Sequence, residues 1–239
     1  MDISNGCGLC YAKQDLVDLA GDVDAAPDDV VALLAGEVSD HWSPEQWQWL
    51  IRRFTPRLLA LVRERKVDVD RALRVYGRFY AHLATWPYDE RQAVEEALHA
   101  ALIDALEHWP TYDLVKMLGG LGSVYDDLGP WLAQVDAASG PAARGGVIRL
   151  AFQWADDLIC GENDFFGWWY PDDPASLVRE WTLNARATVE QFSQEHPTCK
   201  NARDAVRAID YLDRGEDRPW LYFGHHGTLR YIPLDPRSR

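Results

Sequence analysis

Two cysteines near the start of the chain have a spacing that is typical of metal sites. Cys7 and Cys10 are separated by two residues and form a CxxC pair. One such pair supplies two of the four ligands that a structural zinc ion takes. The sequence holds no second close pair, so completing the site requires Cys160, Cys199 or a histidine far along the chain. We expect reduced, partly buried thiols here, with a structural zinc site as the alternative.

Pairs of adjacent aspartates are the second candidate for chemistry, because oxygen ligands suit Mg²⁺. Helical isoprenoid enzymes hold magnesium-diphosphate with acidic residues on facing helices, but their motif needs a further aspartate one turn on. Pro130 and Cys160 stand at that spacing, and no basic cluster is present to receive the diphosphate. We therefore expect one aspartate of each pair to face solvent and the other to cap a helix or pair with arginine. The four pairs are Asp28–Asp29, Asp126–Asp127, Asp156–Asp157 and Asp172–Asp173.

Residues 160–174 read CGENDFFGWWYPDDP and combine five aromatic residues with four acidic ones. The aromatic side chains represent about 1,000 Å² of surface, whereas a soluble monomer seldom exposes an apolar patch beyond about 300–600 Å². We expect Phe165 and Trp169 to pack between two helices, and Asp172 or its neighbour to cap the second helix. Trp168 then remains as a contact for a basic partner. The candidate binding residues are Glu162, Asp164, Trp168 and Asp172 here, with Asp126, Asp127, Asp156 and Asp157 from the pairs above.

The charge of the chain narrows the class of partners. Its 239 residues include 24 Lys and Arg against 38 Asp and Glu, a formal net charge of -14. Nucleic acids and anionic membrane surfaces are disfavoured, since both are bound by clustered Lys and Arg. A basic protein would instead be attracted. No nucleophile elbow and no phosphate-cradling loop is present, so we expect a non-catalytic protein.

The sequence also predicts a compartment. No basic segment followed by an apolar run opens the chain, and no apolar stretch reaches about 18 residues, so neither a signal peptide nor a membrane span is predicted. We expect a cytoplasmic protein, in which the four cysteines are thiols or metal ligands rather than disulfides. A redox role for the CxxC pair requires a βαβ pattern, which the sequence lacks.

Most of the sequence between these candidate residues has apolar residues at the spacing of an α-helix. In residues 88–108 the apolar residues recur at spacings of three and four and form one stripe. Ser43, Pro44 and Gln46 fit an N-cap, a first-turn proline and a capping-box partner. Pro56 is expected to end one helix and begin another. The predicted helices are 12–20, 27–37, 44–54, 56–66, 69–84, 88–108, 111–121, 124–138, 142–159, 174–195 and 197–213.

These elements predict an all-α fold. Short connections favour antiparallel helical hairpins, stacked as a HEAT-like α-solenoid or packed as an irregular bundle. We expect an N-terminal CxxC segment at 1–24, a single helical domain at 25–214 and a tail at 215–239. Within the tail, residues 220–233 read WLYFGHHGTLRYIP, which predicts a short β-hairpin or an extended segment.

Several motifs together resemble a family of uncharacterised all-helical bacterial proteins. They are the N-terminal CxxC, FTPRLLALV (54–62), TWPYDERQAVEEALHAAL (85–102), YDDLGPWL (125–132) and FGWWYPDDPASLVREW (166–181). The family starts one helix with Phe-Leu-Pro-Arg, and Thr55 stands here in place of the leucine. The resemblance implies a helical-repeat architecture and no established activity, so it transfers no functional residue.

Three functions are compatible with the sequence. The first is a non-catalytic protein-binding module, such as an immunity, inhibitor or regulatory protein that covers a basic partner with an acidic, tryptophan-containing surface. The second is a Mg²⁺-dependent helical enzyme that uses the aspartate pairs. The third is an accessory subunit of a larger bacterial assembly.

Overall fold

The structure, a computed structural model, describes residues 1–36, 41–160 and 174–215. These residues form α-helices joined by turns and contain no strand, which confirms the all-α prediction. The predicted tail hairpin lies outside the described residues. The helices are α1 (Lys13–Ala20), α2 (Asp28–Gly36), α3 (Pro44–Arg63), α4 (Val69–Arg74), η2 (Leu83–Thr85, a 3-10 turn), α5 (Tyr88–His108), α6 (Thr111–Tyr125), α7 (Gly129–Ala137), α8 (Pro141–Cys160), α9 (Pro174–Asn184), α10 (Arg186–Glu195) and α11 (Lys200–Arg214).

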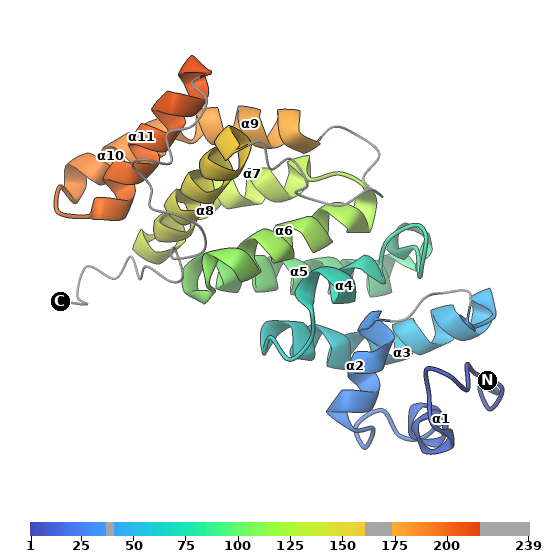
Figure 1. The fold of residues 1–239 in the computed structure, drawn as a ribbon. Helices are drawn as coiled ribbons and strands as arrows, with labels where there is room; N and C mark the ends of the chain where they lie inside the picture. Colours follow the sequence, from blue (N-terminus) through green and yellow to red (C-terminus); the bar gives the residue numbers. More distant parts are fainter. Residues whose placement is uncertain (37–40, 161–173, 216–239) are drawn as a thin grey trace. The chain divides into compact units, whose positions relative to one another are not determined.

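The chain divides into two compact units, and α5 and α6 each contribute residues to both. Unit 1 comprises residues 1–101 and 117–128, and unit 2 comprises residues 102–116 and 129–239. In unit 1, α2 packs on α1, α3 and α4 (Figure 1). In unit 2, α8 packs on α9, α10 and α11. The choice between a solenoid and an irregular bundle stays a prediction.

Helix α3 continues through Pro56, so the predicted break at this residue is wrong. Its N-terminus forms as predicted: Ser43 Oγ accepts the Gln46 N–H, and Gln46 Oε1 accepts the Ser43 N–H at 3.0 Å. Proline inside a helix costs about 3 kcal/mol. The stripe of buried residues that includes Phe54 and Leu58 runs past the proline without interruption. Burial of each large apolar side chain contributes about 1.5–3 kcal/mol, which offsets the cost of the proline.

Helix α4 ends at Arg74, ten residues before the predicted end of a helix over 69–84. Gly77 follows within one turn, and a Cβ there would lie 2.6 Å from the Ser123 carbonyl oxygen. His82 adopts a left-handed conformation with φ of 49°. The backbone thus turns closely against α6 instead of continuing the helix, so the prediction of one helix over 69–84 is wrong; Gly77 is the sequence signal that this prediction did not use.

The end of α5 and the start of α8 form a close contact in unit 2. Gly146 approaches the backbone of Leu106 so closely that a Cβ would lie 2.2 Å from the Leu106 carbonyl oxygen. One turn on, Arg149 Nη2 donates to the carbonyls of Leu106 at 3.0 Å and Trp109 at 3.3 Å. These carbonyls are at the C-terminal end of α5, where the helix itself supplies no donors. Arg149 therefore caps α5 from a neighbouring helix.

The helix predicted over 174–195 is divided into α9 and α10 around Ala185. Trp181 of α9 packs edge-on against Trp154 of α8, with ring centroids 5.1 Å apart. Its indole N–H donates to Asp136 Oδ1 at 2.8 Å. Burial raises the pKa of Asp136, and the hydrogen bond from Trp181 opposes that rise. This tryptophan acts as a wedge between helices, as the sequence predicts for the tryptophans in general.

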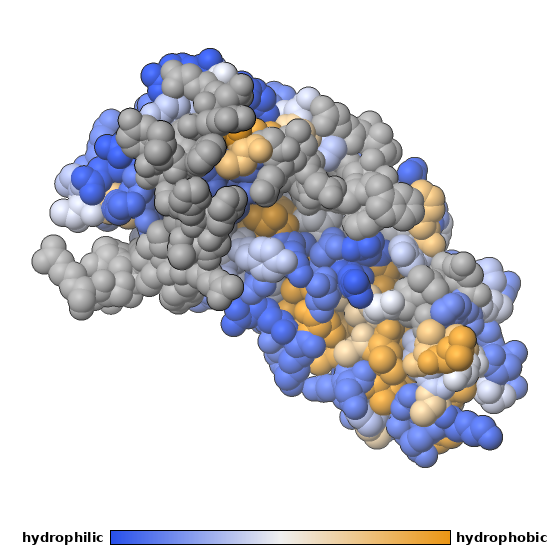
Figure 2. Space-filling model, in the orientation of Figure 1, coloured by the Kyte–Doolittle hydropathy of each residue, from blue (hydrophilic) through white to orange (hydrophobic). Residues whose placement is uncertain are grey.

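The described part of the chain buries most of its tryptophans and presents a largely hydrophilic surface. Seven of the eight described tryptophans are buried, which leaves Trp49 partly exposed. Hydrophilic residues cover much of the described surface, with apolar residues visible over α2 and its surroundings (Figure 2). Within the described ranges, no helix has both the length and the apolar character needed to cross a membrane.

The contact between α8 and α5 can be tested with Gly146→Ala. Alanine favours a helix over glycine by about 1 kcal/mol, but its Cβ overlaps the Leu106 backbone, so we expect a net loss of about 1–3 kcal/mol in unfolding free energy. Gly36→Ala is the control, because a Cβ there meets no heavy atom within 4 Å. Urea denaturation of both variants measures the difference, and equal stability of the two would disprove the close contact.

Candidate metal centre

Cys7, Cys10 and His41 bring three potential metal ligands together in unit 1. One ligand atom from each residue lies within 4.8 Å of the other two. Cys10 Sγ is 3.2 Å from His41 Nδ1, across 31 residues of sequence. Within residues 1–36, 41–160 and 174–215, this is the one group of three or more His, Cys, Asp or Glu side chains with such convergence.

The two cysteines are brought together by a turn. The Cys7 carbonyl accepts hydrogen bonds from the backbone N–H groups of Cys10 at 3.2 Å and Tyr11 at 3.0 Å. Gly8 and Leu9 occupy the tip of this turn, and Leu9 is 98% exposed. The CxxC spacing thus closes a tight loop that puts both sulfur atoms on the side facing His41. This is the local geometry from which zinc sites with paired cysteines are built.

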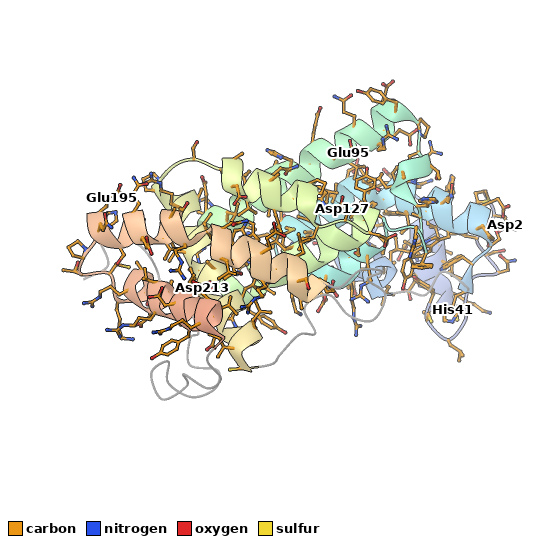
Figure 3. All side chains as sticks on the ribbon, turned by 90° about the horizontal axis from the view of Figure 1, so that it is seen from above. Asp2, His41, Glu95, Asp127, Glu195 and Asp213 are labelled. Carbon is orange, nitrogen blue, oxygen red and sulfur yellow. The ribbon has the colours of Figure 1, made fainter. Side chains whose placement is uncertain are left out.

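His41 reaches this turn because it stands just before α3. Trp42 and the N-cap Ser43 separate it from the first residue of the helix. The capping-box residue Gln46 also binds the N-terminal segment: its Nε2 atom donates to the Asp2 carbonyl at 2.7 Å and to Asn5 Oδ1 at 3.0 Å. One glutamine therefore fixes both the start of α3 and the segment that carries the cysteines. Figure 3 shows Asp2 and His41 in this part of unit 1.

Trp42 is the apolar contact between the two segments. It is 6% exposed and packs edge-on against Tyr11, with ring centroids 5.3 Å apart. On the other side of the CxxC turn, Gly6 touches the same indole so closely that a Cβ would lie 2.5 Å from it. Ile3 is also buried, at 1% exposure. The residues that flank the cysteines are thus packed against the residue that follows His41.

The distances are close to those of a tetrahedral zinc site. Zn–S bonds of about 2.3 Å and Zn–N bonds of about 2.0–2.1 Å place two sulfurs about 3.8 Å apart, and sulfur about 3.5 Å from nitrogen. The observed cluster requires shifts of about 1 Å or less to reach that geometry. Cys7 is half-buried, whereas Cys10 and His41 are exposed. The site therefore fits Zn²⁺ by ligand type and spacing, and solvent reaches it.

Unlike the cysteines, Asp28 and Asp126 of the aspartate pairs form ion pairs with basic side chains. Asp28 binds Arg57 at 2.5 Å and Lys66 at 3.1 Å, and these two cations, Arg57 first, lower the pKa of the Asp28 carboxyl. Asp126 pairs with Arg78 at 2.9 Å. Asp28 and Asp126 thus each pair with an arginine, as expected for one aspartate of each pair.

The other aspartates predicted as binding residues are divided between the two units. Asp126 and Asp127 belong to unit 1, and Asp156 and Asp157 belong to unit 2. Asp157 accepts a hydrogen bond from Gln153 at 2.7 Å. None of the described aspartate pairs enters a three-ligand group. The predictions for Glu162, Asp164, Phe165, Trp168, Trp169, Asp172 and Asp173 lie outside the described residues.

The third candidate ligand in the cluster is His41, and neither Cys160 nor Cys199 is part of it. Cys160 ends α8 and Cys199 precedes α11, and both belong to unit 2. The sequence predicted a distant histidine as one possibility but did not select among seven. One signal was available, because His41 precedes a strong helix start at Ser43 and Pro44, where a side chain is held in place.

Comparison of the chain with protein-family models, curated proteins and solved structures finds no match.

The role of Gln46 in holding the cysteine segment can be measured with Gln46→Ala. The variant loses the hydrogen bond from the Ser43 N–H to the Gln46 side chain and both hydrogen bonds to the segment, so we expect a loss of about 1–2 kcal/mol in stability. Amide hydrogen exchange between Ile3 and Tyr11 should also become faster. Gln191→Ala is the control, since Gln191 donates only to Glu195 one turn away on an exposed surface. Unchanged exchange in Gln46→Ala would show that the segment is held by other contacts.

Proposed function

We propose that this chain is a non-catalytic helical protein-binding module whose N-terminal segment is held by a structural zinc ion. The observation that supports the zinc ion most directly is the convergence of Cys7, Cys10 and His41 from two segments. Thiolate and imidazole are the ligands that zinc favours in structural sites. Zinc would join the CxxC turn to the residue before Trp42 and so fix the segment against α3.

A structural role follows from the position of the site in the fold. The N-terminal segment is short, and its burial rests chiefly on Ile3, Tyr11 and the Trp42 indole. A small apolar contact of this kind stabilises a segment weakly, and small domains commonly use a metal ion to add stability. Because the site forms only in the folded state, the free energy of metal binding adds to the free energy of folding.

The proposal predicts one zinc ion per chain. Protein purified without chelator should contain one equivalent of zinc, measured by elemental analysis, and saturating zinc should raise Tm by about 5 °C or more above the metal-free protein. Cys7→Ser, Cys10→Ser and His41→Ala should each lose the metal and this increase. Acidification should release the metal, because protons compete for both thiolates and the imidazole.

Cys199→Ser is the matched control for these variants. It removes a half-buried cysteine of unit 2 that takes no part in the cluster, so its zinc content and Tm increase should equal those of the unaltered chain. Zinc that persists in His41→Ala at full affinity would refute the proposed ligand set.

The partner that we propose is a basic protein. The formal net charge of -14 supports this, and the acidity is marked in the N-terminal part of the chain: residues 1–36 contain seven aspartates and a single lysine. Opposite charge accelerates association and is screened by salt. Exposed apolar side chains lie in the same part of the chain, among them Leu9 and Val17, which is 61% exposed. An immunity, inhibitor or regulatory protein has these properties.

The charge-based proposal can be tested by comparing two variants of equal charge. Asp24→Asn with Asp29→Asn removes two exposed acids from residues 1–36, and Asp89→Asn with Glu96→Gln removes two exposed acids from α5. For a partner captured from native extract and then purified, we expect the first variant to slow association about threefold or more and the second to change it less. The difference should shrink in high salt. Equal effects of the two variants on the association rate would show that the N-terminal acids are not part of the proposed interface.

A further inference from the structure

We infer that Cys7 and Cys10 form a reversible disulfide, so that the CxxC turn is a redox-sensitive modification site whose oxidant is a small disulfide of the glutathione class. The inference goes beyond the proposed function and does not require the metal, because it concerns the two thiols themselves. The disulfide modifies this chain. It is not the disulfide exchange on other proteins that a βαβ pattern would indicate.

The backbone brings the two cysteines within reach of a disulfide. The Cys10 N–H donates to the Cys7 carbonyl at 3.2 Å, which is the hydrogen bond of a four-residue turn. Such a turn places its first and last Cα atoms less than about 7 Å apart, and disulfides join Cα atoms about 4.4–6.8 Å apart. The two sulfur atoms lie within 4.8 Å of each other. Bond formation therefore requires a shift of the two side chains rather than a rearrangement of the turn.

The surroundings of the turn allow a small oxidant to reach it. Cys10 is exposed, whereas Cys7 is half-buried. The tip between them is uncrowded, because a Cβ added at Gly8 would meet no heavy atom within 4 Å and Leu9 is 98% exposed. Cys10 is therefore the thiol that meets the oxidant, and Cys7 is the thiol that completes the disulfide.

The reaction consists of two thiol–disulfide exchanges. The Cys10 thiolate attacks one sulfur of oxidised glutathione, whose S–S bond breaks, and one glutathione leaves as a thiolate that takes up a proton. The Cys7 thiolate then attacks the Cys10 sulfur of the mixed disulfide, which forms the Cys7–Cys10 bond and releases the second glutathione. The chain loses two electrons and two protons, and both are recovered in two molecules of reduced glutathione.

Contacts that do not use the sulfur atoms keep the segment in place. The Trp42 indole packs against Gly6 and Tyr11 on the two sides of the turn. The Gln46 side chain donates to the backbone of the same segment at 2.7 Å. None of these contacts involves a cysteine side chain, so we expect them in the reduced and the oxidised form. Excess reduced glutathione should therefore restore both thiols without unfolding the segment.

The disulfide and the proposed zinc ion exclude each other. Zinc binds cysteine sulfur as thiolate, and the disulfide engages both sulfurs in a covalent bond. Zinc should therefore protect the reduced form, and oxidation should release the metal. The redox state of the surroundings would in this way control how firmly the N-terminal segment is held.

The test uses the full, metal-free chain in buffers of reduced and oxidised glutathione, with thiols alkylated before digestion with trypsin. Residues 1–13 form one tryptic peptide, which contains Cys7 and Cys10 and no other cysteine. Mass spectrometry of this peptide distinguishes the internal disulfide from alkylated thiols and from bound glutathione. We expect an equilibrium constant for the disulfide at least about tenfold larger in the folded chain than in urea, because the turn holds the thiols together. Equal constants would overturn the inference, since the fold would then contribute nothing.

Two variants verify the pairing. Cys10→Ser should give no internal disulfide in the peptide, and glutathione bound at Cys7 is then the expected product. A variant that combines Cys160→Ser with Cys199→Ser keeps the CxxC turn and should show the same equilibrium constant as the unaltered chain. Loss of the disulfide in this second variant would show that Cys7 and Cys10 pair elsewhere, and would overturn the inference.

Added zinc separates this inference from the proposed function. Saturating zinc should lower the disulfide fraction of the unaltered chain, and it should do so much less in His41→Ala, which keeps both thiols but loses a proposed metal ligand. If zinc has no effect on the unaltered chain, the proposed zinc site fails and the disulfide is retained. If the folded, metal-free chain forms no disulfide between Cys7 and Cys10, the inference fails and the zinc site is retained.

Discussion

The packing of Trp42 is the contact on which the arrangement of unit 1 around the candidate metal centre depends. Its indole lies against Gly6 on one side of the CxxC turn and Tyr11 on the other. His41 precedes it directly, and α3 begins two residues later. The same residue therefore positions His41, supports the cysteine turn and joins both to α3. A short segment without regular secondary structure gains a fixed position from this single side chain and from the hydrogen bonds of Gln46.

The two units use glycine in the same way to bring helices close together. In unit 2, Gly146 brings α8 against the backbone at the end of α5. Arg149 donates hydrogen bonds to carbonyl groups at this end that have no partner within the helix. In unit 1, Gly120 of α6 lies against α4, where a Cβ would be 2.8 Å from Leu73 Cβ. Tryptophans fill the wider spaces, as Trp154 and Trp181 do between α8 and α9. Close backbone contacts and large aromatic wedges thus set the spacing of the helices.

Local signals in the sequence predicted most helices and their starts, because apolar periodicity and capping residues act within a few positions. The range 88–108 matches α5, and Ser43 with Gln46 forms the predicted capping box. The break at Pro56 was wrong because burial along the whole of α3 outweighs a local rule. His41 was not selected because its partner sulfur is 31 residues away, and only tertiary packing brings the two together. The acid–aromatic stretch lies outside the described residues and stays a prediction.

The position of the three ligands within the first 41 residues has a consequence for biosynthesis. A chain emerges from the ribosome N-terminus first, and domains fold in that order. Cys7, Cys10 and His41 are all available to a metal ion before α5 and the helices of unit 2 have been made. In the proposed zinc-bound form, the loop closed between Cys10 and His41 is short compared with the full chain, so the entropic cost of closing it would be modest. The proposed zinc ion would then stabilise this part of unit 1 without contributions from the helices of unit 2.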